Sequence, residues 1–349
     1  MYRTRSGLTA VFCCLGLASL AIEKPTVSRS PELVIERVAE LRDGSESILA
    51  RPWEVVERLD SSFWVVDFSD RNIKVYSHGG HRLRTIGSAG RGPGQFGTVL
   101  SVFPMERGVG AYDFLDSQLV LLDNLGSEIS RTSLVQDRRA RQPIAIRYLG
   151  PDRLLAVYQS ATDGAGLLEV IDFQGSVEAS FMALSEWYRT NPAIESAERI
   201  LADAFDGCIF AASTFSDSLR AFDYEGRQLA AGVWDPSERW PDVPNRQSTL
   251  AEDRPHVRSV VALPGCRALV QVRTAEMGNQ ESVRWNPLEG GEIALFAPAP
   301  PNLLHRIASI RLADAGLLGR DREGRGLVLR NPSDAHDPFV LLRILDTGS

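Results

Sequence analysis

Lysine is nearly absent from this 349-residue chain: only Lys24 and Lys74 occur, so almost all the positive charge is arginine. No long block of basic residues occurs either, and the formal net charge is −7, with 38 Lys and Arg against 45 Asp and Glu. Recognition of a phosphate backbone requires clustered positive charge. The composition therefore predicts that nucleic acid is not a partner.

Catalytic motifs are missing as well. The chain contains no HExxH, GxSxG, P-loop or CxxC sequence. Histidine is scarce, and the five histidines do not share a position in the repeat: His78, His81, His256, His305 and His336. We therefore expect a non-catalytic protein with no cofactor, and a divalent cation held by oxygen ligands in a central channel is the weaker alternative.

One long hydrophobic run occurs, and it lies at the N-terminus. Arg3 and Arg5 precede an apolar segment, 8–21, with small residues at Ser19 and Ala21. This pattern predicts a signal peptide over 1–21, and the run is shorter than the roughly 20 residues that cross a bilayer. We expect a periplasmic or secreted monomer with no transmembrane segment after processing, in which a linker over 22–32 precedes one domain over 33–349.

Cysteine is rare, and only Cys208 and Cys266 follow the predicted signal peptide. Each follows a glycine in what reads as the same turn of two successive repeats. Equivalent strands of packed sheets lie about 10 Å apart, whereas a disulfide requires Cα atoms within roughly 7 Å. The spacing favours two buried free thiols, although export would favour a pair.

What the chain does contain is a repeat. With a period of about 46 residues, the segment 67–80 overlays 113–126 without a gap, so that Asp67 meets Asp113 and Gly80 meets Gly126. An Asp-x-x-Gly turn also recurs, at 123–126, 172–175 and 223–226, with 77–80 as a variant. Asp at the first turn position can accept a backbone N–H, and Gly at the fourth tolerates positive φ.

Each repeat reads as four short strands that begin with an apolar one. The predicted first strands contain 55–56, 100–102, 144–146, 200–202, 260–262 and 307–310. Six four-stranded antiparallel units without helices predict an all-β fold, a six-bladed β-propeller. The last unit lacks a fourth strand, so we expect the segment 33–41 to supply it and close the ring; a helix over 33–41 is the alternative.

One segment carries a family resemblance. Residues 63–96, which include FWVVDFSDRNIKVYSHGG and end in IGSAGRGPGQF, resemble the NHL-type repeat of bacterial six-bladed β-propeller proteins. The resemblance implies the fold and little about function, because such propellers include lyases, scaffolds and sensors. It also makes the glycine-rich stretch a connection between two blades rather than a phosphate-binding loop.

The longest predicted loops are the links between blades, at 88–97, 136–142, 185–197, 235–258 and 297–306. All emerge on one face, and they are rich in arginine and aromatic residues, the composition of binding hot spots. The candidate binding residues are Arg91, Arg139, Trp187, Arg189, Arg239, Trp240, Arg254, His256 and His305. We expect this face to bind a protein, peptide or glycan. The alternative is a metal-dependent lyase or lactonase acting at the central channel through His256, His305 and nearby carboxylates.

Overall fold

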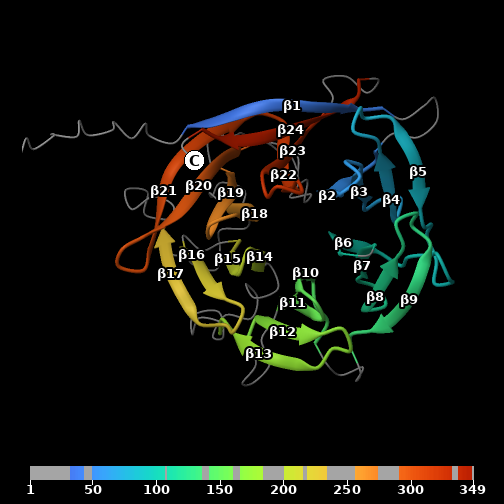
Figure 1. The fold of residues 1–349 in the computed structure, drawn as a ribbon, viewed down its shortest axis with the longest axis horizontal. Helices are drawn as coiled ribbons and strands as arrows, with labels where there is room; N and C mark the ends of the chain where they lie inside the picture. Colours follow the sequence, from blue (N-terminus) through green and yellow to red (C-terminus); the bar gives the residue numbers. More distant parts are fainter. Residues whose placement is uncertain are drawn as a thin grey trace, which may run out of the picture.

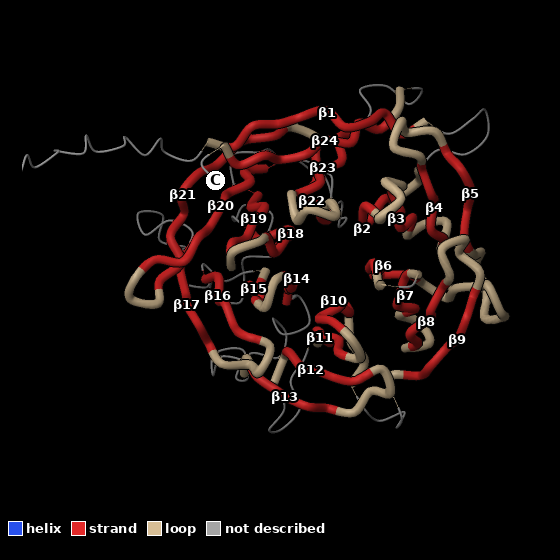
Figure 2. The backbone as a smooth tube through the Cα atoms, viewed as in Figure 1, coloured by secondary structure: helices blue, strands red, loops and turns tan. Residues whose placement is uncertain are grey.

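The structure, a computed structural model, is built of β-strands arranged around a centre (Figure 1). It describes residues 32–42, 49–106, 108–135, 141–159, 166–183, 200–214, 218–233, 256–273, 291–331 and 337–347. Within these ranges every regular element is a strand, and the tube in Figure 2 shows strands joined by short turns. No helix in these ranges is long and apolar enough to pass through a bilayer.

The described ranges contain 24 strands. They are β1 (Leu33–Leu41), β2 (Pro52–Glu57), β3 (Phe63–Asp67), β4 (Asn72–Tyr76), β5 (Arg82–Ile86), β6 (Val99–Pro104), β7 (Val109–Asp113), β8 (Gln118–Leu122), β9 (Glu128–Ser133), β10 (Ala145–Gly150), β11 (Arg153–Val157), β12 (Leu168–Asp172), β13 (Val177–Phe181), β14 (Ile200–Phe205), β15 (Cys208–Ser213), β16 (Ser218–Asp223), β17 (Gln228–Val233), β18 (His256–Leu263), β19 (Arg267–Arg273), β20 (Gly291–Ala299), β21 (Leu303–Leu312), β22 (Ala315–Arg320), β23 (Gly326–Arg330) and β24 (Phe339–Asp346).

The strands form four sheets. Two have four strands, in the orders β6-β7-β8-β9 and β10-β11-β12-β13. Two have eight, in the orders β1-β24-β23-β22-β2-β3-β4-β5 and β14-β15-β16-β17-β21-β20-β19-β18. Each larger sheet is interrupted by one short parallel contact, between β2 and β22 in the first and between β17 and β21 in the second. All other pairings between these strands are antiparallel, so each larger sheet consists of two antiparallel runs.

The centre of the ring is lined by β2, β6, β10, β14, β18 and β22, each of which contacts the next. The strands β2 and β3 are buried on both faces, as their apolar runs predict: Val55, Val65 and Val66 are fully buried. Apolar side chains pack between neighbouring antiparallel runs, for example Val56 and Trp64 against Val102. The core is therefore distributed around the ring, between sheets.

The predicted strand at 33–41 is present as β1, which pairs antiparallel with β24 near the C-terminus. Figure 1 shows β1 on the outside of the ring, beside β24. Gly80 holds the other end of this strand: its φ is +84°, and a Cβ atom there would overlap the carbonyl oxygen of Glu40. Arg42 continues the contact by donating its backbone N–H to the Gly80 carbonyl at 2.8 Å.

The glycine-rich stretch after β5 is a connection, as the repeat predicts. It leads from Ile86 to Val99, the first residue of β6, and buries Phe96 completely. Gly87 has a φ of +80° and packs directly against the Phe96 ring, where a side chain would collide. The Gly94 N–H donates to Glu128 Oε2 at 2.9 Å, so the connection also binds the outer strand β9.

The repeated aspartates and turns have structural roles. In the turn after β12, the Gly175 N–H donates to the Asp172 carbonyl at 3.1 Å, and Asp172 Oδ1 accepts from Gln174 and Ser176. Asp67 and Asp113, which the repeat overlays, are fully buried. Asp67 accepts the backbone N–H groups of residues 50 and 51, just before β2, and Asp113 accepts those of residues 97 and 98, just before β6. These carboxylates tie each link to the sheet that follows it.

The prediction for the last repeat is wrong in its strand assignment. Residues 307–310 belong to β21, which pairs with β20 and lies far from the centre, whereas β22 takes the central position through its contact with β2. The supposed link at 297–306 is instead a hairpin, with the turn at 300–302 between β20 and β21. The isoleucines at 307 and 310 suggested a buried first strand, but in β21 they are only half-buried.

The prediction of free thiols is also wrong, because Cys208 and Cys266 form a disulfide with Cα atoms 5.5 Å apart. The two positions are not equivalent. Cys208 pairs with Phe205 across a two-residue turn, whereas Cys266 lies inside a three-residue turn between Leu263 and Arg267, with a φ of +53°. The turn that contains Cys266 lies against the neighbouring antiparallel run, β14 to β17, where its Cα atom is 5.5 Å from that of Cys208, so the distance between packed sheets does not apply.

Candidate functional site

A cavity of about 790 Å³ occupies the centre of the ring. We call the end of the ring where β5 leads to β6 and β9 leads to β10 the link face, and the opposite end, with the turns 58–62 and 151–152, the turn face. The cavity is lined at the link face by Phe68, Thr98 and Phe114 and at the turn face by Pro104 and Gly150. It therefore extends along the axis of the ring, between the two faces.

Its walls are mainly apolar. Aromatic residues border it at both ends: Trp53 packs against Phe68 with ring centroids 5.5 Å apart, and Phe103 stacks on Tyr148 at 5.9 Å. Leu115, in the turn after β7, is 50% exposed and also lines the cavity. A concave, largely apolar site with a few fixed polar groups is the usual form of a ligand pocket.

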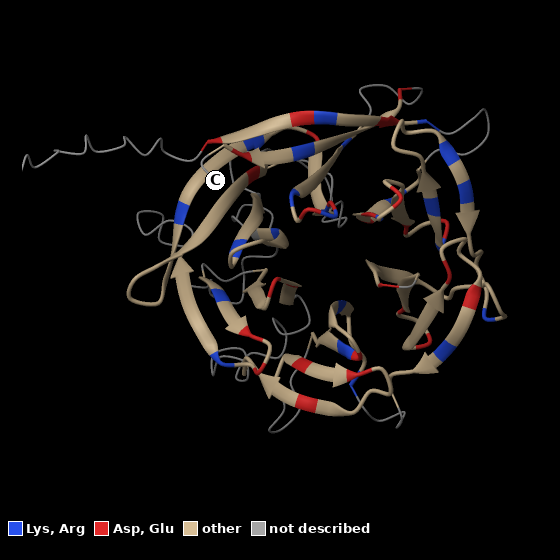
Figure 3. Ribbon diagram, viewed as in Figure 1, with Lys and Arg blue, Asp and Glu red and all other residues tan. Residues whose placement is uncertain are grey.

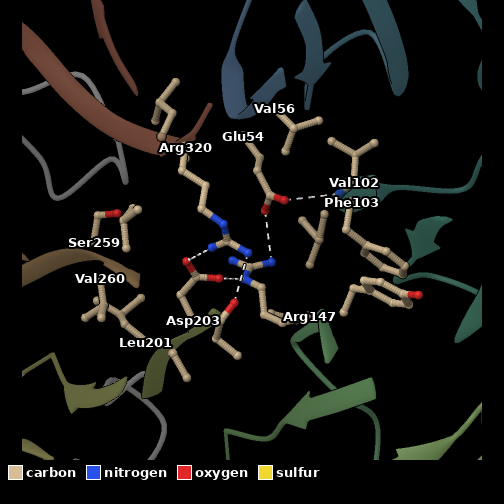
Figure 4. A pocket seen from close by; sticks show the side chains of 18 of the residues that line it. Glu54, Val56, Val102, Phe103, Arg147, Leu201, Asp203, Ser259, Val260 and Arg320 are labelled. Atoms are coloured by element: carbon tan, nitrogen blue, oxygen red, sulfur yellow. Dashed lines mark hydrogen bonds and ion pairs between the residues drawn. The ribbon is translucent and has the colours of Figure 1, made fainter. Parts of the chain in front are cut away.

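The polar groups form a belt around the middle of the cavity, which we define as Glu54, Arg147, Asp203 and Arg320 (Figure 4). Each comes from a different central strand: β2, β10, β14 and β22. The ring arrangement brings these strands to one axis, so residues separated by up to 266 positions in the sequence (320 − 54) share one cluster.

Arg147 joins two members of the belt. Its Nη1 lies 3.0 Å from Glu54 Oε2, and its Nε lies 3.4 Å from Asp203 Oδ1. The same Nη1 donates to Ser101 Oγ at 2.9 Å, which adds β6 to the network. The guanidinium is thus held by partners on three other central strands.

Asp203 and Arg320 complete the belt. Arg320 Nη1 donates to Asp203 Oδ2, and Arg320 Nη2 donates to the Ala204 carbonyl at 2.9 Å. The Ala262 N–H of β18 also donates to Asp203 Oδ2, at 2.9 Å. The Val102 N–H of β6 donates to Glu54 Oε1 at 3.1 Å. Together with the contacts of Arg147 on β10, the bonds of the belt involve all six strands that line the centre.

Glu54 has an unusual protonation equilibrium. Burial raises its pKa from 4.5 to about 7, and the opposing attraction of Arg147 and the hydrogen bond from Val102 only partly offset that effect. A carboxyl group that titrates near neutral pH inside a cavity is a marker of a functional site.

Charge outside the belt is dispersed. Figure 3 shows basic and acidic residues interspersed around the ring, on inner and outer strands alike. Within the described ranges, no group of three or more His, Cys, Asp and Glu side chains is placed to hold a metal ion. Four aspartates that recur in successive repeats, at 70, 116, 163 and 217, could have supplied oxygen ligands to a cation. Asp70 pairs with Lys74 and Asp116 with Arg91, while residues 163 and 217 lie outside the described residues.

Few of the sequence-predicted binding residues fall in the described part of the chain. Outside it lie Arg139, Trp187, Arg189, Arg239, Trp240 and Arg254. Arg91 lies on the connection after β5, where its exposed side chain is 3.2 Å from Asp116 Oδ1. The backbone of His256 opens β18, which corrects the prediction that its link continues to residue 258.

His305 lies in β21, not in a link, and it is exposed. The hairpin at 300–302 places it on an outer strand, while Arg91 lies on the connection between β5 and β6, so the structure does not bring these two candidates together. The sequence contained a signal for the belt that we did not use: Glu54, Arg147 and Asp203 each adjoin a predicted apolar first strand, at 55–56, 144–146 and 200–202.

No protein-family model and no curated protein sequence matches this chain. Solved structures do match. A protein of Bacteroides fragilis NCTC 9343 that is named as exported has a TM-score of 0.60 at 12% identity, covering 92% of this chain and 96% of its own. A member of the DUF4221 family from Bacteroides vulgatus has a TM-score of 0.61 at 9% identity, covering 92% and 100%.

A catalytically inactive virginiamycin B lyase from Staphylococcus aureus, solved with quinupristin, has a TM-score of 0.50 at 11% identity and covers 90% of this chain and 100% of its own. At these identities the likeness concerns the fold alone. The likeness to these structures and the arrangement of the sheets around a central cavity together show that this chain has a β-propeller-like fold.

Proposed function

We propose that this protein is an exported, non-catalytic β-propeller that binds a protein, peptide or glycan ligand at its link face, with part of the ligand entering the central cavity. The observation that carries the proposal is the cavity itself: about 790 Å³, with apolar walls and a charged belt at its centre. This volume suits a small molecule or a few residues of a chain.

The propeller in this proposal has six blades of four strands. Each eight-stranded sheet is interpreted as two blades, because its halves are antiparallel and meet only at one short parallel contact. The sixth blade then consists of β22, β23 and β24 with β1 as its outer strand, and β1 closes the ring. The NHL-type resemblance of residues 63–96 supports the same count.

Export is inferred from the first residues and from the relatives. Residues 1–21 have the charge, apolar run and small residues of a signal peptide, and the Bacteroides fragilis protein is named as exported. The disulfide between Cys208 and Cys266 supports an oxidising compartment. In this proposal residues 33–349 form one domain after a linker at 22–32.

The arginine and tryptophan residues of the predicted links belong to the same binding face. Arg239 and Trp240 are the leading candidates, because their link is the longest one in the sequence and long loops are usually functional. Leu115 adds an exposed apolar contact at the mouth of the cavity.

The test is capture of ligands from an envelope extract by the mature protein, with variants that separate the link face from the rest of the surface. Leu115→Arg places a charge at the cavity mouth, and Leu125→Arg is its matched control, because Leu125 is 71% exposed in the turn after β8 and does not line the cavity. A second variant carries Arg239→Ala with Trp240→Ala.

We expect at least one captured ligand to be lost from Leu115→Arg and from the double variant but retained by Leu125→Arg. Each protein is first shown to be folded by its thermal melting. If every captured ligand binds all three variants as it binds the wild type, neither the cavity mouth nor the predicted link residues form the binding site, and the proposal is wrong.

A further inference from the structure

We infer that the belt binds a carboxylate group of the ligand through Arg147 and Arg320, and that Glu54 takes up a proton as the carboxylate binds. This inference rests on the proposed function and specifies the chemistry of the ligand. It follows from which atoms of the belt face the cavity, from what already holds them, and from the charge balance of the site.

All four belt residues line the cavity, but the two arginines are the more exposed members. The side chains of Arg147 and Arg320 are 22% and 20% exposed, whereas those of Glu54 and Asp203 are 10% and 6% exposed. The two arginines therefore present more of their side-chain surface to the cavity than the two acids do. A ligand that enters the cavity encounters a positive surface, although the four groups nearly cancel in charge.

Both guanidinium groups are fixed in place with donors to spare. Among the described residues, the contacts of Arg147 use Nη1 and Nε, and those of Arg320 use Nη1 and Nη2. Nη2 of Arg147 and Nε of Arg320 are thus available to a ligand. Arg320 is further held over the Phe205 ring, 4.7 Å from its centroid. A planar guanidinium that its surroundings already orient loses little entropy when it binds a carboxylate.

The charge balance explains why a proton accompanies the ligand. Among the described residues, five arginines and five acidic residues line the cavity; besides the belt they are Arg51, Glu57, Asp206, Arg258, Asp321 and Arg322. The charged groups that act on Glu54 are Arg147 on β10, Asp203 on β14 and Arg320 on β22. A ligand carboxylate beside Arg147 would leave one negative charge in excess within a buried site.

Protonation of Glu54 removes that excess. The neutral carboxyl keeps its oxygen toward the Val102 N–H and releases Arg147 from one ion pair, so Arg147 can pair with the ligand. Burial already brings the pKa of Glu54 to about 7, so the proton costs little near neutral pH. The ligand's own carboxyl, with a pKa of roughly 4, stays ionised over the same range.

The rest of the cavity indicates what the carboxylate is attached to. Trp53, Phe68 and Phe114 line the approach from the link face, and Ile144 and Leu201 line the walls beside the belt. The ligand is therefore an apolar chain or apolar side chains that end in a carboxylate. A peptide with a free C-terminus has this chemistry and belongs to the proposed ligand class, whereas a fatty acid has the same chemistry and lies outside that class.

Isothermal titration calorimetry with defined probes tests the inference. The probes are acetyl-Leu-Phe-Leu with a free carboxyl, the same peptide as its amide, octanoate, and octanamide, each at pH 6 and pH 8. We expect at least one acid to bind at least ten times more tightly than its amide. The acid that binds identifies the source, peptide or fatty acid.

The proton gives a second readout. If binding requires neutral Glu54 and its pKa is about 7, the affinity of the acid at pH 6 exceeds that at pH 8 by about tenfold. Glu54→Gln should bind the acid at pH 8 as the wild type does at pH 6. Arg147→Gln should lose the preference for acid over amide, whereas Arg153→Gln, at a site on β11 that does not line the cavity, should keep it.

The inference is overturned if neither acid binds, if an amide binds as well as its acid, or if the affinity of the wild type is the same at both pH values. These outcomes are separable from a failure of the proposed function. A protein that ignores all four probes but still captures an envelope ligand in a Leu115-dependent manner binds at its link face with a different chemistry.

Discussion

Replacing Glu54 by glutamine removes one titrating group from the centre of the ring and leaves the shape of its side chain unchanged. In the folded protein, burial raises the pKa of this carboxyl from 4.5 to about 7, and unfolding returns it to its ordinary value. The folded state therefore binds the proton more tightly than the unfolded state, so the contribution of Glu54 to stability is largest below pH 4.5. It is lost progressively as the pH rises to 7.

The magnitude follows from the pKa difference. Each pKa unit is worth about 1.4 kcal/mol, so the full effect is about 3 kcal/mol, most of which falls between pH 5 and pH 8. The side chain of Glu54 is only 10% exposed, so solvent screens this effect little. Glutamine cannot ionise and should show none of it.

Urea unfolding at pH 5, 6, 7 and 8 measures the difference. We expect the free energy of unfolding of the wild type to fall by about 2 to 3 kcal/mol more than that of Glu54→Gln across this range, with equal m-values. Glutamine can offer only one acceptor to the Val102 N–H and Arg147 Nη1, which both contact Glu54, but that constant offset cancels between slopes. If the two proteins have parallel pH profiles, Glu54 is ionised throughout and the account of its burial is wrong.

Two further predictions concern how the ring is held together. Replacing Cys208 and Cys266 by alanine removes a cross-link between residues 58 positions apart and should lower the free energy of unfolding by about 4 kcal/mol. The disulfide would be contradicted if neither the double replacement nor a reductant changes the urea unfolding curve. Gly80→Ala forces a side chain onto the Glu40 carbonyl at a φ of +84° and should cost about 2 kcal/mol or more and increase amide hydrogen exchange in β1. Gly79→Ala is its control, because there the nearest atom to a new Cβ is 3.7 Å away, and equal effects at the two glycines would refute the assigned contact.

The sequence predicted the parts of the fold that depend on local pattern. Unalternated apolar runs such as the one around Val55 indicated strands buried on both faces, and the Asp-x-x-Gly turn at Asp172 indicated a hairpin with Gly175 at positive φ; both are confirmed. The prediction failed at 307–310, where isoleucines typical of a central strand lie in the half-buried outer strand β21. Strand type could be read locally, but the position of a strand within its sheet depends on which partners it finds.

Local pattern carries only a weak signal for the candidate site. Glu54, Arg147, Asp203 and Arg320 are separated by dozens of residues or more, and each alone is a charged residue beside or within an apolar segment. The predicted candidates Arg91 and His305 lie on separate elements, and one of them was assigned to a link that is in fact a strand.

What the sequence determined by itself is therefore the repeat: apolar strands, glycine and aspartate turns, and a first strand left over for the last sheet, all set by short-range chemistry. Only the tertiary structure decided that β2, β6, β10, β14, β18 and β22 meet at one axis. That meeting turns isolated charges into a belt, brings the two cysteines within bonding distance, and raises the pKa of Glu54. Each of these properties depends on distance and burial, which arise when remote strands pack together around a shared centre.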